Sequence, residues 1–133
     1  MTSETNALGQ AAKWQWDFGA GKVTTATDID GVNTTYSYSD PLDRMTQAVR
    51  AANVGGFTTQ TNVVYTSPTD VNVYNDQVTA GDKALRAETV YDGFGRESES
   101  RQYESASGYI ATTKSYDALG ASSVPAMSRR FRR

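Results

Sequence analysis

The carboxylates are the first candidates for chemistry in this chain, whose 133 residues include no cysteine and no histidine. Disulfides, thiolate chemistry, imidazole bases and histidine-ligated metals are therefore excluded. Carboxylate pairs can act as the acid and base of a glycoside hydrolase, and Asp40 with Asp43 or Glu97 with Glu99 are candidates. Such pairs arise readily among 15 acidic residues, and RESESR (96–101) has the alternation of a solvated strand face. We therefore predict no catalytic site.

Two segments have some features of ligand-binding loops. Asp28-x-Asp30-Gly31-x-Asn33 places oxygen atoms at alternate positions, as calcium sites do, but no Glu closes the loop at the EF-hand distance. GAGK (19–22) has the Gly and Lys of a phosphate loop without the full pattern and without a following helix. Both segments are explained as hairpin turns, so we predict neither a metal nor a cofactor.

Charge is distributed unevenly along the chain. Residues 121–133 contain four arginines and no acid, and subtracting these from the 13 basic residues leaves nine against 15 acids. Residues 1–120 therefore carry a formal charge of −6, which does not favour nucleic-acid binding. The N-terminal segment MTSETNALGQAAKWQW lacks a signal-peptide core, and no stretch is long and apolar enough to insert into a membrane.

An aromatic residue precedes a turn at five nearly regular positions. The segments are QWDFGAGK, SYSDPLDR, VYTSPTDV, VYDGFGRE and SYDALGAS, whose aromatic residues are Trp16, Tyr38, Tyr65, Tyr91 and Tyr116. The intervals of 22, 27, 26 and 25 residues indicate an internal repeat. Glycine-containing segments lie between these marks, at 28–33, 53–57, 79–83 and 105–109.

Each repeat of about 25 residues therefore reads as strand, turn, strand, turn. Segments such as KVTTATD, VNTTYSYS, FTTQTNVVY and YIATTKSYD are rich in Thr, Val and Tyr, which favour strands. ALRAETVYD and RESESRQYES are read in the same way. Since no segment keeps a helical apolar period, the sequence predicts an all-β fold of consecutive antiparallel hairpins.

The motif Tyr-Asp-x-x-Gly-Arg has a physical role in a turn. The Asp carboxylate can accept backbone N–H groups two or three residues on, and Gly takes the left-handed conformation. The Arg can return to the carboxylate or stack on a Tyr of a neighbouring repeat. The predicted turn residues are Tyr91, Asp92, Gly95 and Arg96, then Tyr116, Asp117 and Gly120, with Asp40 and Arg44 as a variant copy.

Aromatic residues two positions apart point to one face of a strand. We predict that such residues form an aromatic ladder across adjacent hairpins, each cross-strand pair contributing roughly 0.2–1 kcal/mol. The predicted members are Trp14, Trp16, Tyr36, Tyr38 and Tyr65.

These motifs resemble the YD-repeat, or Rhs-repeat, family. VYDGFGR matches the family signature directly, SYDALG matches five positions, and GVNTTYSYSDPLDRMTQAV matches the return strand, turn and following strand. The resemblance covers about residues 14–120. It implies a single curved ribbon of hairpins, which in this family spirals into a hollow shell. The shell encloses a toxin or effector domain in bacteria and is an adhesion scaffold in animal relatives.

The resemblance predicts a non-enzymatic structural module, part of the wall of a large secreted or cell-surface protein. Its expected partners are neighbouring repeats of a longer chain and an enclosed effector domain. The alternative is a carbohydrate-binding or adhesive surface that uses exposed aromatic rings. A ribbon with open edges should be marginally stable alone, so we expect self-association or partial order.

We divide the chain into a lead-in at 1–13, the hairpin repeats at 14–120 and a basic tail at 121–133. Where the family has Arg after Gly120, this chain continues ASSVPAMSRRFRR. The tail is either a true basic terminus or the product of a truncated or shifted reading frame, and we favour the second. RRFRR could contact nucleic acid or an anionic membrane, but we favour a disordered or artefactual segment.

Overall fold

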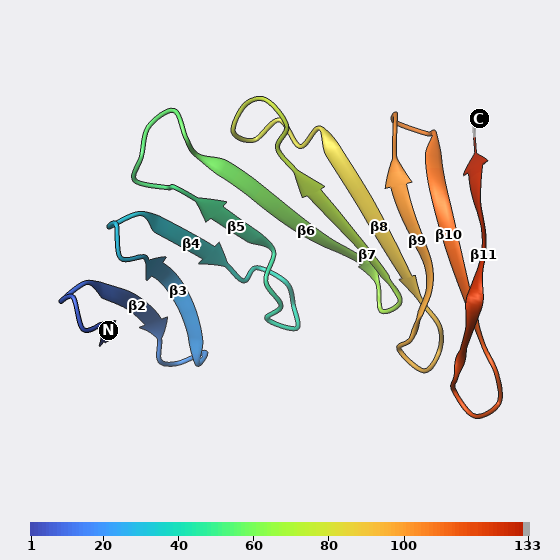
Figure 1. The fold of residues 1–133 in the computed structure, drawn as a ribbon, viewed down its shortest axis with the longest axis horizontal. Coiled ribbons are helices and arrows are strands. Elements are labelled where there is room, and N and C mark those ends of the chain that lie inside the picture. The colour runs from blue at the N-terminus through green and yellow to red at the C-terminus, as the bar shows by residue number, and fades with distance from the viewer. Residues whose placement is uncertain (132–133) are drawn as a thin grey trace. The chain divides into compact units, whose positions relative to one another are not determined.

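The computed structural model describes the backbone of residues 1–131 and the side chains of residues 1–122. This part of the chain contains 11 strands and no helix. The strands are β1 (Thr2–Thr5), β2 (Ala11–Asp17), β3 (Lys22–Thr27), β4 (Asn33–Ser37), β5 (Gln47–Arg50), β6 (Thr59–Ser67), β7 (Asp70–Asn75), β8 (Leu85–Tyr91), β9 (Glu97–Tyr103), β10 (Tyr109–Tyr116) and β11 (Ser122–Phe131). Each strand is hydrogen-bonded to the next one in the chain (Figure 1). The prediction of an all-β fold built from consecutive antiparallel hairpins is confirmed.

The chain divides into two compact units. Unit 1 comprises Met1–Asn62 and Asn75–Lys83, and unit 2 comprises Val63–Tyr74 and Ala84–Arg133. The described residues include no helix that is long and apolar enough to cross a membrane.

In unit 1, the register places residues of similar type side by side. Thr25 pairs with Thr35, Thr35 with Val49, and Val49 with Gln60. β-branched and polar residues suit a pleated surface that is solvated, which explains why this sequence forms strands without a continuous apolar face.

In unit 2, the register brings opposite charges together. Glu88 of β8 lies directly opposite Arg101 of β9, and Arg101 lies opposite Ala111 of β10. Directly opposite residues of an antiparallel pair are close enough for their side chains to interact. The centre of this sheet is therefore positioned to hold a charged cluster.

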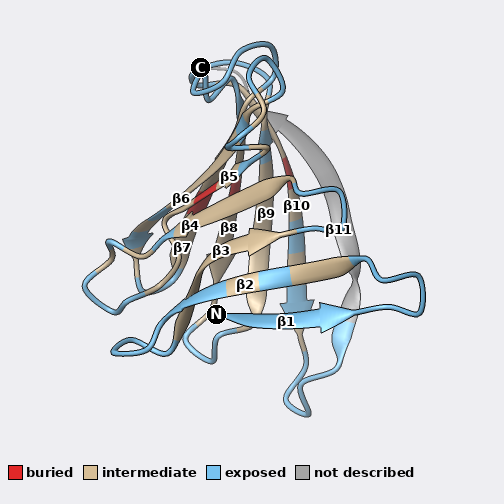
Figure 2. Ribbon diagram, turned by 90° about the vertical axis from the view of Figure 1, so that its left-hand side faces the viewer, coloured by how far each residue is buried: buried red, intermediate tan, exposed pale blue. Residues whose placement is uncertain are grey.

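Very few described side chains are buried. The buried hydrophobic residues are Ala48 at 8% and Ala111 at 2% exposure, and the buried polar residues are Asn72 and Glu88. Figure 2 shows buried positions as a few short red stretches among intermediate and exposed ones. Neither unit has a packed apolar core in its described part, so hydrogen-bonded ladders and side-chain contacts within one layer hold each sheet.

Several strands lie where the sequence was not read as strand. β1 lies within the segment expected to be only a lead-in, and its four residues pair with β2. β7 also lies in a segment that was not read as a strand, whereas β5 lies largely in MTQAV (45–49), which was read as the strand after the turn at 40–44. A strand of four residues carries too little alternation to be recognised, and pairing with a neighbour decides its conformation.

RRFRR (129–133) was expected to be disordered or artefactual, but the backbone of Arg129–Phe131 is the end of β11 (Ser122–Phe131), which pairs with β10. This pairing has two register shifts, between Ala111 and Thr113 and between Thr113 and Ser115. The backbone of the tail can continue the ladder because hydrogen bonding along a strand does not require the repeat sequence. Arg132 and Arg133 lie outside the described residues.

Candidate functional site: turns and a charged cluster

The turn at 92–96 is organised by one carboxylate. Asp92 Oδ1 accepts hydrogen bonds from the backbone N–H of Phe94 at 2.9 Å and of Arg96 at 3.0 Å. Asp92 Oδ2 accepts from Arg96 Nε at 2.8 Å and lies 2.8 Å from Arg96 Nη2. Gly95 has φ of 76°, and its N–H donates to the Asp92 carbonyl at 3.0 Å. The backbone and side-chain hydrogen bonds from Arg96 lower the pKa of Asp92.

Arg96 also connects this turn to the next hairpin of unit 2. Its guanidinium carbon lies 4.3 Å from the centre of the Tyr116 ring. The Tyr116 hydroxyl donates to the carbonyl oxygen of Glu97 at 2.7 Å. One cation therefore serves its own turn and the aromatic residue of the following repeat, the two uses that the sequence motif suggests for the arginine.

The same relation occurs in unit 1 with different residues. Lys22 Nζ lies 5.0 Å from the centre of the Tyr38 ring, and the Tyr38 hydroxyl donates to the Val23 carbonyl at 2.9 Å. In both units, the tyrosine hydroxyl bonds the carbonyl of the residue that follows the cation. The two units therefore share a contact between a cation and the tyrosine of the following repeat. The cation is Lys in unit 1 and Arg in unit 2.

The variant turn at 40–44 keeps the carboxylate–guanidinium pair. Asp40 Oδ2 accepts from Arg44 Nε at 2.8 Å, and Oδ1 accepts from Arg44 Nη2 at 2.9 Å. The side-chain hydrogen bond from Arg44 lowers the pKa of Asp40 to about 2. Asp43 replaces the glycine and takes φ of 56°, which Asp tolerates better than most residues. We call the turns at 40–44 and 92–96 the Asp–Arg turns.

The turn at 117–121 keeps only half of this arrangement. Asp117 Oδ1 accepts from the N–H groups of Leu119 and Ala121, both at 2.9 Å, and Gly120 has φ of 82°. Ala121 stands where the Asp–Arg turns have Arg, so the carboxylate has no guanidinium from its own turn. The third repeat differs more, because Ser67 Oγ accepts from the Thr69 N–H at 3.2 Å in place of an Asp.

The five predicted ladder residues are placed on or just after strands of hairpin repeats. Trp14 and Trp16 lie in β2, Tyr36 in β4, Tyr38 just after β4, and Tyr65 in β6. Trp16 is 39% exposed, and the other four are half-buried.

Within unit 1, the register places Trp14 opposite Ala26 and Tyr36 opposite Ala48. Each ring therefore lies beside a small residue, which leaves room for it on the pleated face. The role of these residues as a ladder between hairpins stays a prediction. A ring pair that the sequence analysis did not single out occurs in unit 2, where the centres of Tyr103 and Tyr109 are 5.2 Å apart.

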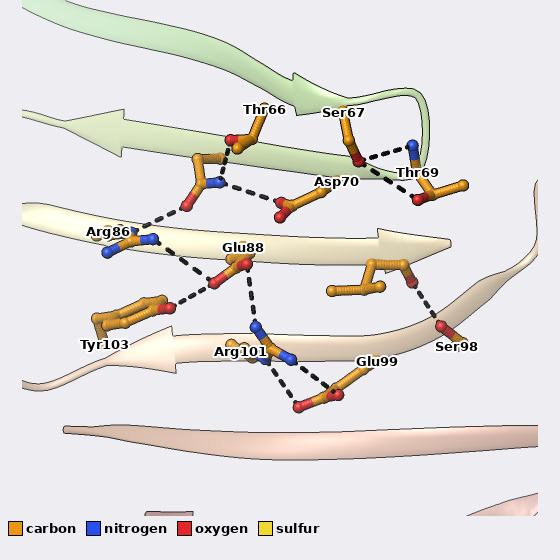
Figure 3. Close-up of polar contacts among 12 residues, drawn as sticks. Thr66, Ser67, Thr69, Asp70, Arg86, Glu88, Ser98, Glu99, Arg101 and Tyr103 are labelled. Atoms are coloured by element: carbon orange, nitrogen blue, oxygen red, sulfur yellow. Dashed lines mark hydrogen bonds and ion pairs between the residues drawn. The ribbon is translucent and has the colours of Figure 1, made fainter. Parts of the chain in front are cut away.

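A charged cluster on β7, β8 and β9 is centred on Glu88, whose side chain is 5% exposed (Figure 3). Arg101 Nη1 lies 3.0 Å from Glu88 Oε1, and Arg86 Nη2 lies 3.6 Å from Glu88 Oε2. The Tyr103 hydroxyl also donates to Glu88 Oε2. Burial opposes ionisation of Glu88, but the hydrogen bond from Tyr103 and the charge of Arg101 outweigh it and lower the pKa of Glu88.

Asn72 extends the cluster to β7. Its side chain is buried, its Nδ2 donates to Thr66 Oγ1 and to Asp70 Oδ1 at 3.1 Å each, and its Oδ1 accepts from Arg86 Nε at 2.9 Å. Every polar atom of this amide therefore has a partner, as burial requires.

Two guanidinium groups cover the cluster. Arg101 binds Glu99 through Nε at 2.8 Å and Nη2 at 3.2 Å. The guanidinium carbon of Arg86 lies 3.9 Å from the Tyr103 ring centre. Cation–aromatic stacking and bidentate pairing are the two geometries for which Arg is better suited than Lys. These contacts explain how Glu88 is buried without a packed apolar core around it among the described side chains.

This cluster was not predicted from the sequence. Glu99 was expected on a solvated strand face, whereas it pairs with Arg101 beside the buried Glu88. A signal was present in the complementary spacing of Arg86-x-Glu88 and Glu99-x-Arg101, because residues two apart share a strand face.

In the two segments that have features of ligand-binding loops, 28–33 and 19–22, an Asp side chain forms hydrogen bonds within a turn. Asp28 Oδ1 accepts from the N–H groups of Asp30 and Val32 at 2.9 Å each. Asp17 Oδ1 accepts from the N–H of Gly19, within the GAGK segment, at 2.9 Å. Among the described residues, no group of three or more Asp and Glu side chains could hold a metal ion.

The proposed carboxylate pairs do not converge on a shared site either. Asp40 pairs with Arg44, whereas Asp43 is exposed and lies 3.8 Å from Lys22. Glu97 Oε2 lies 3.0 Å from Lys114 Nζ, whereas Glu99 is bound by Arg101. Each carboxylate is therefore engaged by a different cation.

Comparison with known proteins assigns a family to part of this chain. Residues 16–54 match the family model described as RHS Repeat. The prediction of a YD/Rhs-type repeat is therefore confirmed, and the matched segment contains the Lys22–Tyr38 contact and the Asp40–Arg44 turn. No curated protein matches the chain. In unit 2, outside the matched segment, the Arg96–Tyr116 contact resembles the Lys22–Tyr38 contact, since each tyrosine hydroxyl donates to the carbonyl of the residue after the cation.

Proposed function

We propose that the chain is a structural module in the wall of a larger secreted or cell-surface repeat protein that encloses or presents another domain. The observation that carries this proposal is the composition of the buried positions. Among the described side chains, the buried hydrophobic residues are two alanines, Ala48 and Ala111. A sheet that buries so little apolar surface gains little stability from its own packing and relies on neighbouring repeats for more.

The contacts between hairpins support the same proposal. The Lys22–Tyr38 and Arg96–Tyr116 pairs each join one repeat to the following one. A contact pattern that links each repeat to its neighbour suits an extended wall, since it can be continued along the chain without a central core. The partners we propose are further repeats of a parent chain and an enclosed effector domain, and we propose neither an enzymatic reaction nor nucleic-acid binding.

The test is the behaviour of the 133-residue chain alone. We expect self-association in light scattering and a low or weakly cooperative thermal transition in circular dichroism, because the open strand edges and small core leave the sheet marginal. A monomer with a high, cooperative melting transition would contradict the proposal.

The alternative is a carbohydrate-binding or adhesive surface, which requires rings exposed in a row. Trp16 is the predicted ladder residue that reaches clear exposure, and the Tyr38 ring lies against Lys22. These positions favour the wall over the glycan surface. Binding to a glycan array that is lost in the Trp16→Ala variant would favour the carbohydrate-binding surface. The absence of binding would agree with a structural module in a wall.

A further inference from the structure

A polar groove lies on one face of β2, β3 and β4, three neighbouring strands of unit 1 (Figure 1). Its volume is about 400 Å³, which falls within the range of small-molecule sites. Residues directly opposite each other in antiparallel strands share a face, so the register of these strands forms the lining. Besides Met1, the lining consists of two rows, Lys13, Thr27 and Asn33 in the first and Gln15, Thr25 and Thr35 in the second.

Several hydrogen-bonding groups of this groove are not used within the described part of the chain. Lys13 and Gln15 are exposed, and no described residue bonds the Lys13 ammonium or the Gln15 side-chain amide. Asn33 Oδ1 accepts from Thr27 Oγ1 at 2.8 Å, and this bond orients the amide so that Nδ2 remains as a donor. The groove therefore offers one ammonium group and two amides to a ligand.

The charge of the groove differs from that of the chain around it. None of the lining residues is acidic and Lys13 is cationic, whereas residues 1–120 carry a formal charge of −6. The complementary ligand is therefore anionic. None of the lining residues is aromatic either, so a sugar would find no ring on which to stack. This lining favours an acidic peptide over an acidic saccharide.

We propose that the groove binds an extended acidic peptide segment of another protein, with a carboxylate of the peptide at Lys13 and a backbone peptide group at Gln15 or Asn33. A side-chain amide has the same donor and acceptor as a peptide group, so the two can pair at two points. Residues two apart are separated by about 7 Å both in a strand and in an extended peptide. A peptide aligned with β2 can therefore engage Lys13 and Gln15 together. The groove lies within unit 1, and its binding does not depend on the chain being part of a wall.

The experiment measures binding of fluorescein-labelled hexaglutamate to the 133-residue chain by fluorescence anisotropy. We expect binding that weakens as the salt concentration rises, and no binding of hexaglutamine, which has the same length without the charge. Absence of hexaglutamate binding would overturn the proposal, as would equal binding of hexaglutamine. Equal or tighter binding of a penta-galacturonate would also overturn it, and would assign the groove to an acidic saccharide.

Two variants of the groove locate the binding on the chain. Lys13→Gln should weaken hexaglutamate binding about two- to fivefold, because an exposed ion pair is lost. Gln15→Leu should weaken it by a similar factor, because the amide is lost, and should leave the salt dependence unchanged. Lys114→Gln on β10 of unit 2 is the control of equal charge and should bind like the native chain. An unchanged affinity in either groove variant, or an equal loss in Lys114→Gln, would overturn the proposal.

The groove variants should keep the circular dichroism of the native chain, since Lys13 and Gln15 are exposed. The comparison of hexaglutamate with hexaglutamine uses the native chain alone, so it tests the proposal even where a variant loses its strand signal.

Discussion

The Asp–Arg turn at 92–96 and the cluster around Glu88 use the same chemistry at different depths of unit 2. In the turn, the side chains of Arg96 and Asp92 are 34% and 23% exposed, whereas the Glu88 side chain is 5% exposed. An exposed ion pair contributes little net energy, because water solvates both groups almost as well. A buried carboxylate is not solvated by water, so removing one of its charged partners leaves an uncompensated buried charge and costs more. We therefore expect the turn mainly to set backbone geometry and the cluster to contribute more to the stability of unit 2.

The largest expected effect is that of Glu88→Gln. This change leaves Arg86 without its carboxylate and removes one of the two that hold Arg101, so we expect a loss of about 3 kcal/mol in the stability of unit 2. Urea unfolding followed by hydrogen exchange of the β8 and β9 amides measures the loss. Arg96→Gln in the exposed turn is the comparison. If Arg96→Gln lowered the stability of unit 2 as much as Glu88→Gln, the turn and the cluster would not differ in their contribution to stability.

The second prediction concerns the backbone of the turn. Gly95 has φ of 76°, so Gly95→Ala should cost about 1 kcal/mol through backbone strain alone, since an added Cβ would meet open space. Gly93→Ala is the matched control, because Gly93 also faces open space and is not among the glycines with positive φ. Thermal unfolding of both variants separates strain from packing. Equal losses would mean that the left-handed conformation is not what the turn requires.

The third prediction concerns acid. Because the pKa of Asp40 is lowered from 3.8 to about 2, the folded turn binds fewer protons than the unfolded chain between these values. The contribution of Asp40 to stability is therefore complete above pH 3.8 and is lost as pH falls through about 2. Carboxyl NMR should place the Asp40 transition near this value, and Arg44→Gln should raise it. A transition unaffected by Arg44→Gln would show that Arg44 does not hold the carboxylate in solution.

The smallest expected effect comes from completing the defective turn. Ala121→Arg supplies the cation that Asp117 lacks, and an exposed pair of this kind should add about 0.2–1 kcal/mol. Slower hydrogen exchange at the Leu119 and residue-121 amides, compared with Ala121→Gln, measures it. A gain of the same size with Gln would show that charge is not the cause.

Some of the fold could be predicted from sequence with simple rules. The recurrence of Tyr38, Tyr91 and Tyr116 before turns, and the glycines between them, predicted consecutive hairpins. Those signals are local, because a turn is defined by four or five residues in a row. β1 and β11 were missed for the converse reason: their sequences lack the pattern, and pairing with β2 and β10 makes them strands.

The turns follow from local sequence alone, since Asp, Gly and Arg at fixed spacing specify both the conformation and its hydrogen bonds. The pairing of the strands, and with it the burial of Glu88, depends on long-range contacts that no local pattern specifies. Arg86 and Glu88 share a strand, but Arg101 and Tyr103 reach Glu88 from the neighbouring strand β9. Charge spacing along one strand shows that a charged face exists. The register of the adjacent strands decides whether that face is solvated or covered, because cross-strand neighbours supply the side chains that exclude water.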